Sequence, residues 1–210
     1  MMTMISHHGS NSWRFESPSR HQIRFTMLPV RPTDISFHFP YVSRILARCR
    51  ETKYEEILDK HNQLSITGRD GTNVTDGIGS LWDYQLGKFT AETGDFTVIN
   101  DDFKDDVCLM RVIGAVKEDA AKHGKLIGRI RFMRLKPKTC LTLHKDPDEF
   151  RYHMPLETSY NCFFVVGTCV FRMPKVGQVY LLDTREEHTA INASNNDRIH
   201  LVFDTFDAKP

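Results

Sequence analysis

The chain has 210 residues, of which 40% are hydrophobic, and this length and composition are sufficient for one domain with a buried core. Its 28 Lys and Arg residues nearly balance 27 Asp and Glu residues, so a formal net charge of +1 produces no field that would attract nucleic acid. No apolar run approaches the roughly 20 residues that a membrane-spanning helix needs, which predicts a soluble protein without a membrane partner.

The first residues of the chain are polar. Residues 1–25 are rich in Ser, His and Arg, and we expect them to form a flexible segment. They lack the continuous apolar core of a secretory signal, although their Arg and Ser content faintly resembles that of a transit peptide. The five cysteines are an odd number without the close spacing typical of zinc sites, which indicates reduced thiols. Together these features favour a cytoplasmic protein.

Residues 26–126 are expected to form a mixed helical and strand region that packs on the core that follows. Apolar residues recur at helical spacing within Tyr41–His61. Gly, Asn and Asp positions cluster in Asn62–Ser80, which predicts a loop or hairpin region. Trp82 and Tyr84 follow this region and are candidates for substrate contact, because they combine a large ring with a polar tip. Packing is the more common role for such aromatic residues.

A second and stronger helix is predicted in the same region. Asp101 or Asp102 offers the N-cap, an apolar stripe recurs from Phe103 to Val116, and Gly124 ends the pattern. We interpret both helices as support for a sheet.

Short segments with β patterning dominate the remainder of the chain. Turns containing Gly, Pro, Asn and Asp join eight of them, namely Ile127–Leu135, Thr139–His144, Tyr152–Leu156, Asn161–Val166, Cys169–Met173, Val176–Leu182, His188–Asn192 and Arg198–Phe206. This pattern predicts a mainly β fold with flanking helices and a jelly-roll core in residues 127–207. Arg129, Arg131 and Asn161 are further candidates for substrate contact on inward strand faces.

Two histidines and an aspartate in this core indicate a metal site. Two imidazoles and a carboxylate are the ligand set of non-heme Fe(II) oxygenases, because they bind one face of the metal and leave other positions open. Alternation along a strand puts His144 and Asp146 on one face, and Pro147 ends that strand. His188 begins a separate strand. Asp148 is a rival ligand, and a chance arrangement among ten histidines is the alternative explanation.

An arginine begins the last predicted strand. Alternation there gives two faces: Arg198, His200 and Val202 on one, and Ile199, Leu201 and Phe203 on the other. A buried guanidinium needs an anion, and it pairs with a carboxylate through two parallel hydrogen bonds. A dicarboxylic cosubstrate would supply this anion. The alternative is a structural salt bridge to Asp197, Asp204 or Glu187.

Several motifs together carry a family resemblance. They are Leu143–Asp146, Arg151–Leu156, Gly177–Asp183, His188, Asn192 and Arg198–Asp204. The combination, over about residues 127–207, resembles the aspartyl/asparaginyl β-hydroxylase family of Fe(II)- and 2-oxoglutarate-dependent dioxygenases. The resemblance implies a double-stranded β-helix, also called a cupin fold, and a reaction that consumes 2-oxoglutarate and O2.

The resemblance also implies roles for individual residues. The catalytic iron ligands would be His144, Asp146 and His188, and the cosubstrate-binding residues would be Arg198, for the distal carboxylate, with Arg151 and His153. The implied reaction hydroxylates an amino acid, an aspartyl- or asparaginyl-type protein residue or a related small molecule, and releases succinate and CO2. The alternative is a noncatalytic cupin that binds a small acid or serves as an interaction module.

Overall fold

The structure, a computed structural model, describes residues 28–83, 85–146 and 150–207 of the chain. The expectations for residues 1–25, for Tyr84 and for Asp148 concern positions outside these ranges. Within the ranges, none of the helices has the length and hydropathy that crossing a bilayer requires.

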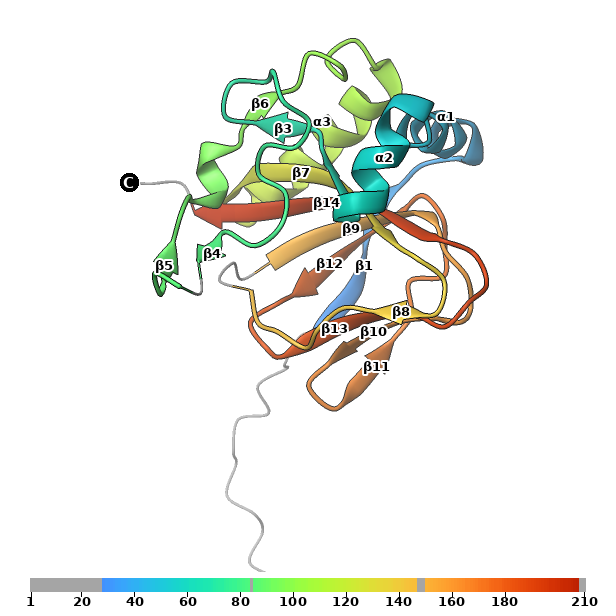
Figure 1. Cartoon of the computed structure of the whole chain (residues 1–210). Helices are drawn as coiled ribbons and strands as arrows, with labels where there is room; N and C mark the ends of the chain where they lie inside the picture. The colour runs from blue at the N-terminus through green and yellow to red at the C-terminus, as the bar shows by residue number, and fades with distance from the viewer. Residues whose placement is uncertain (1–27, 84, 147–149, 208–210) are drawn as a thin grey trace, which may run out of the picture.

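Two antiparallel β-sheets face each other and form the core of the protein (Figure 1). The larger sheet has six strands in the order β1 (Val30–Ser36), β12 (Gln178–Asp183), β9 (Phe150–Glu157), β14 (Arg198–Asp207), β7 (Lys125–Leu135) and β2 (Gln63–Ser65). The smaller sheet has four, in the order β11 (Cys169–Phe171), β10 (Cys162–Val166), β13 (His188–Asn192) and β8 (Thr139–Cys140). The predicted mainly β fold with a double-stranded β-helix is therefore confirmed.

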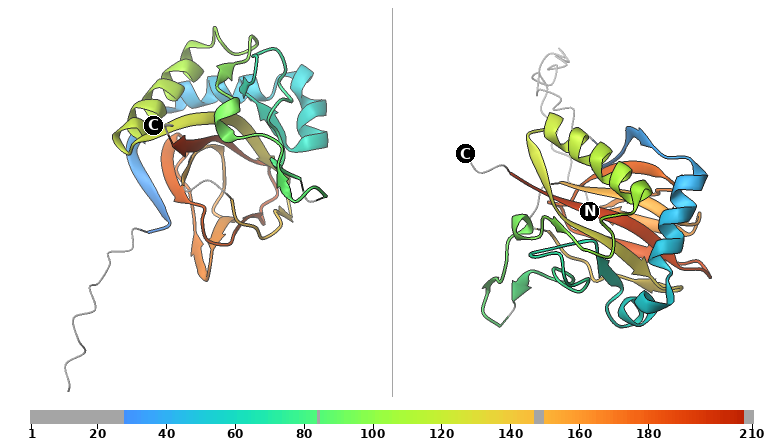
Figure 2. Two further views of the ribbon diagram at one scale, coloured as in Figure 1. Left: turned by 90° about the vertical axis from the view of Figure 1, so that its left-hand side faces the viewer. Right: turned by 90° about the horizontal axis from the view of Figure 1, so that it is seen from above.

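Three helices cover the outer face of the larger sheet (Figure 2). They are α1 (Phe39–Cys49), α2 (Thr52–His61) and α3 (Val107–Lys122). Their apolar faces and that side of the sheet share one hydrophobic cluster, which includes Ile45, Leu58, Leu109, Phe132 and Leu201. The predicted role of the helices as support for the sheet agrees with this packing.

The boundaries of the helices differ from the predicted ones. Tyr41–His61 contains two helices, because the backbone of Glu51 is extended and begins α2 as its N-cap. The long helix begins only at Val107, where the side chain of Asp106 accepts a hydrogen bond from the Leu109 N–H. The predicted N-cap at Asp101 or Asp102 was therefore wrong. A cap has to lie where the chain leaves extended backbone, which composition alone does not fix.

The inner faces of the two sheets enclose a second, smaller apolar cluster. It includes Leu135, Phe164, Tyr180 and Leu182. Along β14 the side chains alternate as predicted, because Ile199, Leu201 and Phe203 pack in the cluster beneath the helices. The remaining inward positions on the larger sheet carry an unusual number of polar side chains, namely Arg129, Arg131, Arg151, His153, Arg198, His200 and Asp204.

Several strands were not predicted, and some, including Thr139–His144 and Cys169–Met173, were predicted too long. The edge strands β1 and β2 come from the region expected to be mixed, as do the pairs β3 (Thr67–Gly68) with β6 (Val98–Ile99) and β4 (Trp82–Asp83) with β5 (Lys88–Phe89). A 3-10 helix, Thr93–Asp95, lies between β5 and β6. The strand expected at Thr139–His144 ends at Cys140, and His144 forms only an isolated bridge with His188.

Candidate active site

The side chains of His144, Asp146 and His188 meet at one point. One candidate ligand atom from each lies within 4.8 Å of the others. The His188 Nε2 atom is 3.2 Å from Asp146 Oδ2, and the His144 Nε2 atom is 3.9 Å from Asp146 Oδ1. His188 is buried, whereas His144 and Asp146 are partly exposed. Residues that are distant in the sequence thus form one cluster.

Backbone hydrogen bonds bring the two histidines together. The His144 N–H donates to the His188 carbonyl at 3.1 Å, and the His188 N–H donates to the His144 carbonyl at 2.8 Å. The Asp146 N–H donates to the Thr184 carbonyl at 3.3 Å. The segment around His144 and Asp146 is therefore attached to the start of β13 by a few bonds, without a continuous strand ladder.

The imidazole rings are oriented by their other nitrogen atoms. His144 Nδ1 lies 2.6 Å from the Thr142 carbonyl oxygen, and His188 Nδ1 lies 3.0 Å from the Glu186 carbonyl oxygen. A carbonyl oxygen can only accept a hydrogen bond, so each Nδ1 carries a proton, and Nε2 is the nitrogen of each ring that can offer a lone pair to a cation. Metal-binding histidines are typically oriented in this way.

These lone pairs make the cluster suitable for a cation. An imidazole lone pair and a carboxylate oxygen 3.2 Å apart repel each other unless a proton or a metal cation lies between them. Three such groups converge here, and two nitrogens with one carboxylate oxygen match the donor set of a non-heme Fe(II) site. The residues present thus fit a divalent metal ion. The rival explanation, a chance occurrence of these residues in the sequence, does not account for the convergence.

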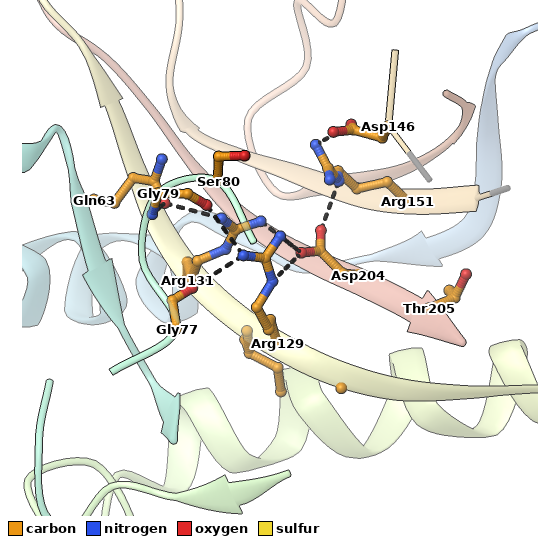
Figure 3. Close-up of polar contacts among 12 residues, drawn as sticks. Gln63, Gly77, Gly79, Ser80, Arg129, Arg131, Asp146, Arg151, Asp204 and Thr205 are labelled. Atoms are coloured by element: carbon orange, nitrogen blue, oxygen red, sulfur yellow. Dashed lines mark hydrogen bonds and ion pairs between the residues drawn. The ribbon is translucent and has the colours of Figure 1, made fainter. Parts of the chain in front are cut away.

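Asp146 also contacts an arginine. Arg151 Nη1 lies 2.6 Å from Asp146 Oδ2 and forms an ion pair with it (Figure 3). Burial would raise the pKa of Asp146, but the charge of the adjacent Arg151 guanidinium outweighs burial and holds this pKa below its usual value. Asp146 is therefore ionised at neutral pH, as a metal ligand must be.

Asp204 holds three arginines of the larger sheet. The carboxylate is completely buried, and its contacts are 2.6 Å to Arg151 Nε, 2.6 Å to Arg131 Nη2 and 2.8 Å to Arg129 Nη2 (Figure 3). Arg129 additionally donates to the carbonyl oxygens of Gly77 and Gly79, at 3.1 and 3.2 Å. Burial opposes ionisation of Asp204, but the three guanidinium groups lower its pKa to about 2. Arg129 and Arg131 thus make structural contacts here, and a substrate contact of either stays a prediction.

Arg198 is buried without a carboxylate partner among the residues that the structure describes. Its Nη2 atom donates to His200 Nδ1 at 3.2 Å. The salt bridge that was the alternative for Arg198 is not formed, because Asp204 pairs with the three other arginines and Asp197 lies nearest to Arg50 and Arg134. Burial lowers the pKa of Arg198 to about 10, so the group still carries its charge at neutral pH. A buried, charged guanidinium of this kind is suited to an anionic ligand.

Two further histidines lie beside Arg198. His153 Nδ1 is 3.3 Å from His200 Nδ1, and the Nε2 atoms of both rings are buried without a hydrogen-bond partner in the described part of the chain. Burial, and then the charge of Arg198, hold the pKa of each ring well below its usual value. Unpaired buried polar atoms are rare in proteins. Arg198, His153 and His200 therefore form a buried polar cluster whose chemistry suits a carboxylate-bearing group.

Sequence reasoning identified most of this arrangement but missed two residues. His200 and Asp204 share the inward face of β14 with Arg198, so alternation along the strand could have identified both as candidates. Of the aromatic candidates, Trp82 is exposed on the β4–β5 hairpin, where its ring and that of Phe89 form a T-shaped pair. Asn161 is exposed in the turn before β10. Contact of Trp82 or Asn161 with a substrate stays a prediction.

Comparison with known proteins gives a family match over part of the chain and a shared fold. Residues 109–208 match the family model described as aspartyl/asparaginyl beta-hydroxylase. No curated protein matches the sequence.

Solved structures with the same fold have little sequence in common with this chain. The truncated viral collagen prolyl hydroxylase of Paramecium Bursaria Chlorella virus-1 is 10% identical, with a TM-score of 0.55, and the match covers 94% of this chain and 100% of that chain. The non-heme monooxygenase ThoJ, in complex with nickel, is 10% identical with a TM-score of 0.53, covering 85% and 74%. AviO1 of Streptomyces viridochromogenes Tue57 is 14% identical with a TM-score of 0.52, covering 87% and 92%. These likenesses show a shared fold. The match over residues 109–208, which include every residue of the metal cluster, confirms the resemblance to the aspartyl/asparaginyl β-hydroxylase family.

Proposed function

We propose that this protein is an Fe(II)- and 2-oxoglutarate-dependent dioxygenase. It would hydroxylate an amino acid, an aspartyl- or asparaginyl-type protein residue or a related small molecule. The observation that carries the proposal is the convergence of His144, Asp146 and His188, with both Nε2 lone pairs and the carboxylate directed at one point. The family match supports the hydroxylase activity.

The proposed roles follow from the chemistry of each group. His144, Asp146 and His188 would hold Fe(II) on one face and leave its remaining positions for cosubstrate and O2. When bound, the iron would supply the oxidising chemistry by which a substrate C–H bond becomes C–OH while 2-oxoglutarate and O2 are converted to succinate, CO2 and the hydroxyl oxygen. The protein's own contribution is to fix ligand geometry and to shield the site.

Arg198 would bind the distal carboxylate of 2-oxoglutarate. Support comes from its burial, its retained charge and its lack of a carboxylate partner within the described ranges. The unpaired Nε2 atoms of His153 and His200 would complete this cosubstrate pocket, one as a donor and the other as an acceptor.

The direct test measures succinate formed from 2-oxoglutarate by protein loaded anaerobically with Fe(II) and then exposed to O2 with a panel of amino acids and peptides. His188→Ala should abolish both iron binding and succinate formation. His123→Ala, which changes an exposed histidine at the end of α3, is the matched control and should behave as wild type. Full turnover by His188→Ala would contradict the proposal. Binding of Fe(II) and 2-oxoglutarate without turnover across the panel would instead favour a noncatalytic small-acid binding module.

A further inference from the structure

The aspartate of the metal cluster has little backbone support. Asp146 follows the isolated bridge between His144 and His188, and its N–H makes one hydrogen bond, to the Thr184 carbonyl. Histidines at such a site can be oriented by their second ring nitrogen, as His144 and His188 are. A carboxylate has no such second group, so its orientation depends on what its oxygen atoms contact.

Arg151 provides that contact from a rigid strand. Its Nη1 atom lies 2.6 Å from Asp146 Oδ2, while its Nε atom lies 2.6 Å from Asp204 Oδ1. A guanidinium group is planar, so fixing one edge fixes the direction of the other nitrogen atoms. Arg151 and Asp204 are also directly paired in the register of β9 and β14, which keeps their side chains adjacent.

Asp204 is in turn fixed by contacts that do not involve the metal cluster. Arg129 and Arg131 both contact Oδ2, which leaves Oδ1 for Arg151 (Figure 3). Arg131 also donates to Gln63 Oε1, and Arg129 donates to Gly77 and Gly79. The carboxylate therefore cannot turn without breaking contacts to strand β7 and to the segment before β4. Through Arg151, Asp146 is thus connected to a carboxylate that is fixed in the larger sheet.

We infer that Arg151 and Asp204 are positioning residues that hold Asp146 in the orientation required to bind the metal. This inference rests on the proposed function, because it assigns a role in the same metal site. A carboxylate has two oxygen atoms, so Asp146 can offer one to a cation while Arg151 retains the other. Residues that orient a metal ligand in this way typically contribute tenfold to a hundredfold to metal affinity.

The test measures the Kd of Co(II), titrated anaerobically into the metal-free full-length protein and followed by its visible absorption spectrum. Arg151→Met should weaken Co(II) binding by about 10- to 100-fold and change the spectrum, because Asp146 loses its orientation. Arg151→Lys should recover part of the affinity, since an ammonium group retains the charge but cannot bridge both carboxylates with a planar fork. Asp204→Asn should weaken binding in the same direction.

The matched control is Arg134→Met. Arg134 is also a buried arginine, on β7, but it pairs with Glu55 and Asp59 away from the metal cluster. Its replacement should lower the melting temperature without changing the Co(II) Kd. Asp204→Asn leaves three buried guanidinium groups without their common carboxylate and can fail to fold, so Arg151→Met and Arg151→Lys, which leave Asp204 paired with Arg129 and Arg131, decide the outcome.

A wild-type Kd and spectrum for Arg151→Met would overturn the inference. Measuring His188→Ala in the same titration distinguishes that result from failure of the proposed function. If His188→Ala loses Co(II) binding while Arg151→Met does not, the metal site stands and the positioning role falls. If His188→Ala also binds Co(II) normally, the metal site itself is wrong.

Discussion

Arg198 and Arg151 are both buried arginines on the inward face of the larger sheet, yet their surroundings are opposite. Arg151 lies between two carboxylates, Asp146 and Asp204, at 2.6 Å from each. Arg198 has no carboxylate partner in the part of the chain that the structure describes, and it contacts the ring of His200. Both were predicted to bind the cosubstrate.

The difference separates an arginine suited to a ligand from one that holds the protein's own groups in place. Burying a guanidinium without an anion is costly, so Arg198 is stabilised only when an anion enters. Arg151 already has its anions, and a second carboxylate would have to compete with them. Cosubstrate binding by Arg198 is therefore the role we propose first, and a contact between Arg151 and 2-oxoglutarate stays a prediction.

The largest expected effect follows removal of Arg198. Arg198→Met should weaken 2-oxoglutarate binding by about 10- to 100-fold, which corresponds to a charge-assisted pair worth about 1.5 to 3 kcal/mol. Calorimetric titration of 2-oxoglutarate into anaerobic Co(II)-loaded protein measures this change. The Co(II) Kd should remain that of wild type. An unchanged affinity for 2-oxoglutarate would remove Arg198 from the cosubstrate site.

The pH dependence of stability should differ between the two regions. Folding lowers the pKa of His153 and His200, so the unfolded chain binds more protons than the folded protein below about pH 6.5. The free energy of unfolding therefore has its full value above about pH 6.5. Below that pH it falls by about 1.4 kcal/mol per pH unit for each ring. Asp204, whose pKa is about 2, contributes stability that is lost only when pH falls below about 4.

Urea unfolding of the metal-free protein between pH 7.5 and pH 5, with a chelator present, measures the histidine contribution. Replacing one ring, as in His200→Gln, should remove about one proton from the number taken up on unfolding. His123→Ala, at an exposed position, serves as the control. Equal slopes for wild type and His200→Gln would show that this ring does not remain neutral in the folded protein.

The smallest expected effect concerns Arg151 and the cosubstrate. At saturating Co(II), Arg151→Met should change the affinity for 2-oxoglutarate by no more than about twofold, because the Arg151 guanidinium is already paired with Asp146 and Asp204. The same calorimetric titration measures this value. A loss as large as that of Arg198→Met would show that Arg151 binds the cosubstrate as the family resemblance implied.

The sequence was sufficient where local periodicity decides structure. Alternation along β14 predicted that Arg198 and His200 face away from Leu201 and Phe203, and the packing under the helices agrees. Residue chemistry and the family resemblance selected His144, Asp146 and His188, which the structure brings together. The division into a region at 26–126 and a core at 127–207 stays a prediction, although β1 and β2 join the larger sheet from the earlier region.

Only the tertiary structure decided what each buried charge contacts. Asp204 and Arg151 are 53 positions apart, and they meet because β9 pairs with β14 in one particular register. The pattern of a strand determines which face a side chain occupies, but not which side chain lies opposite on the neighbouring strand. The neighbouring side chain determines the role of a buried arginine. A guanidinium paired with carboxylates stabilises the structure, whereas one without them is suited to binding a ligand.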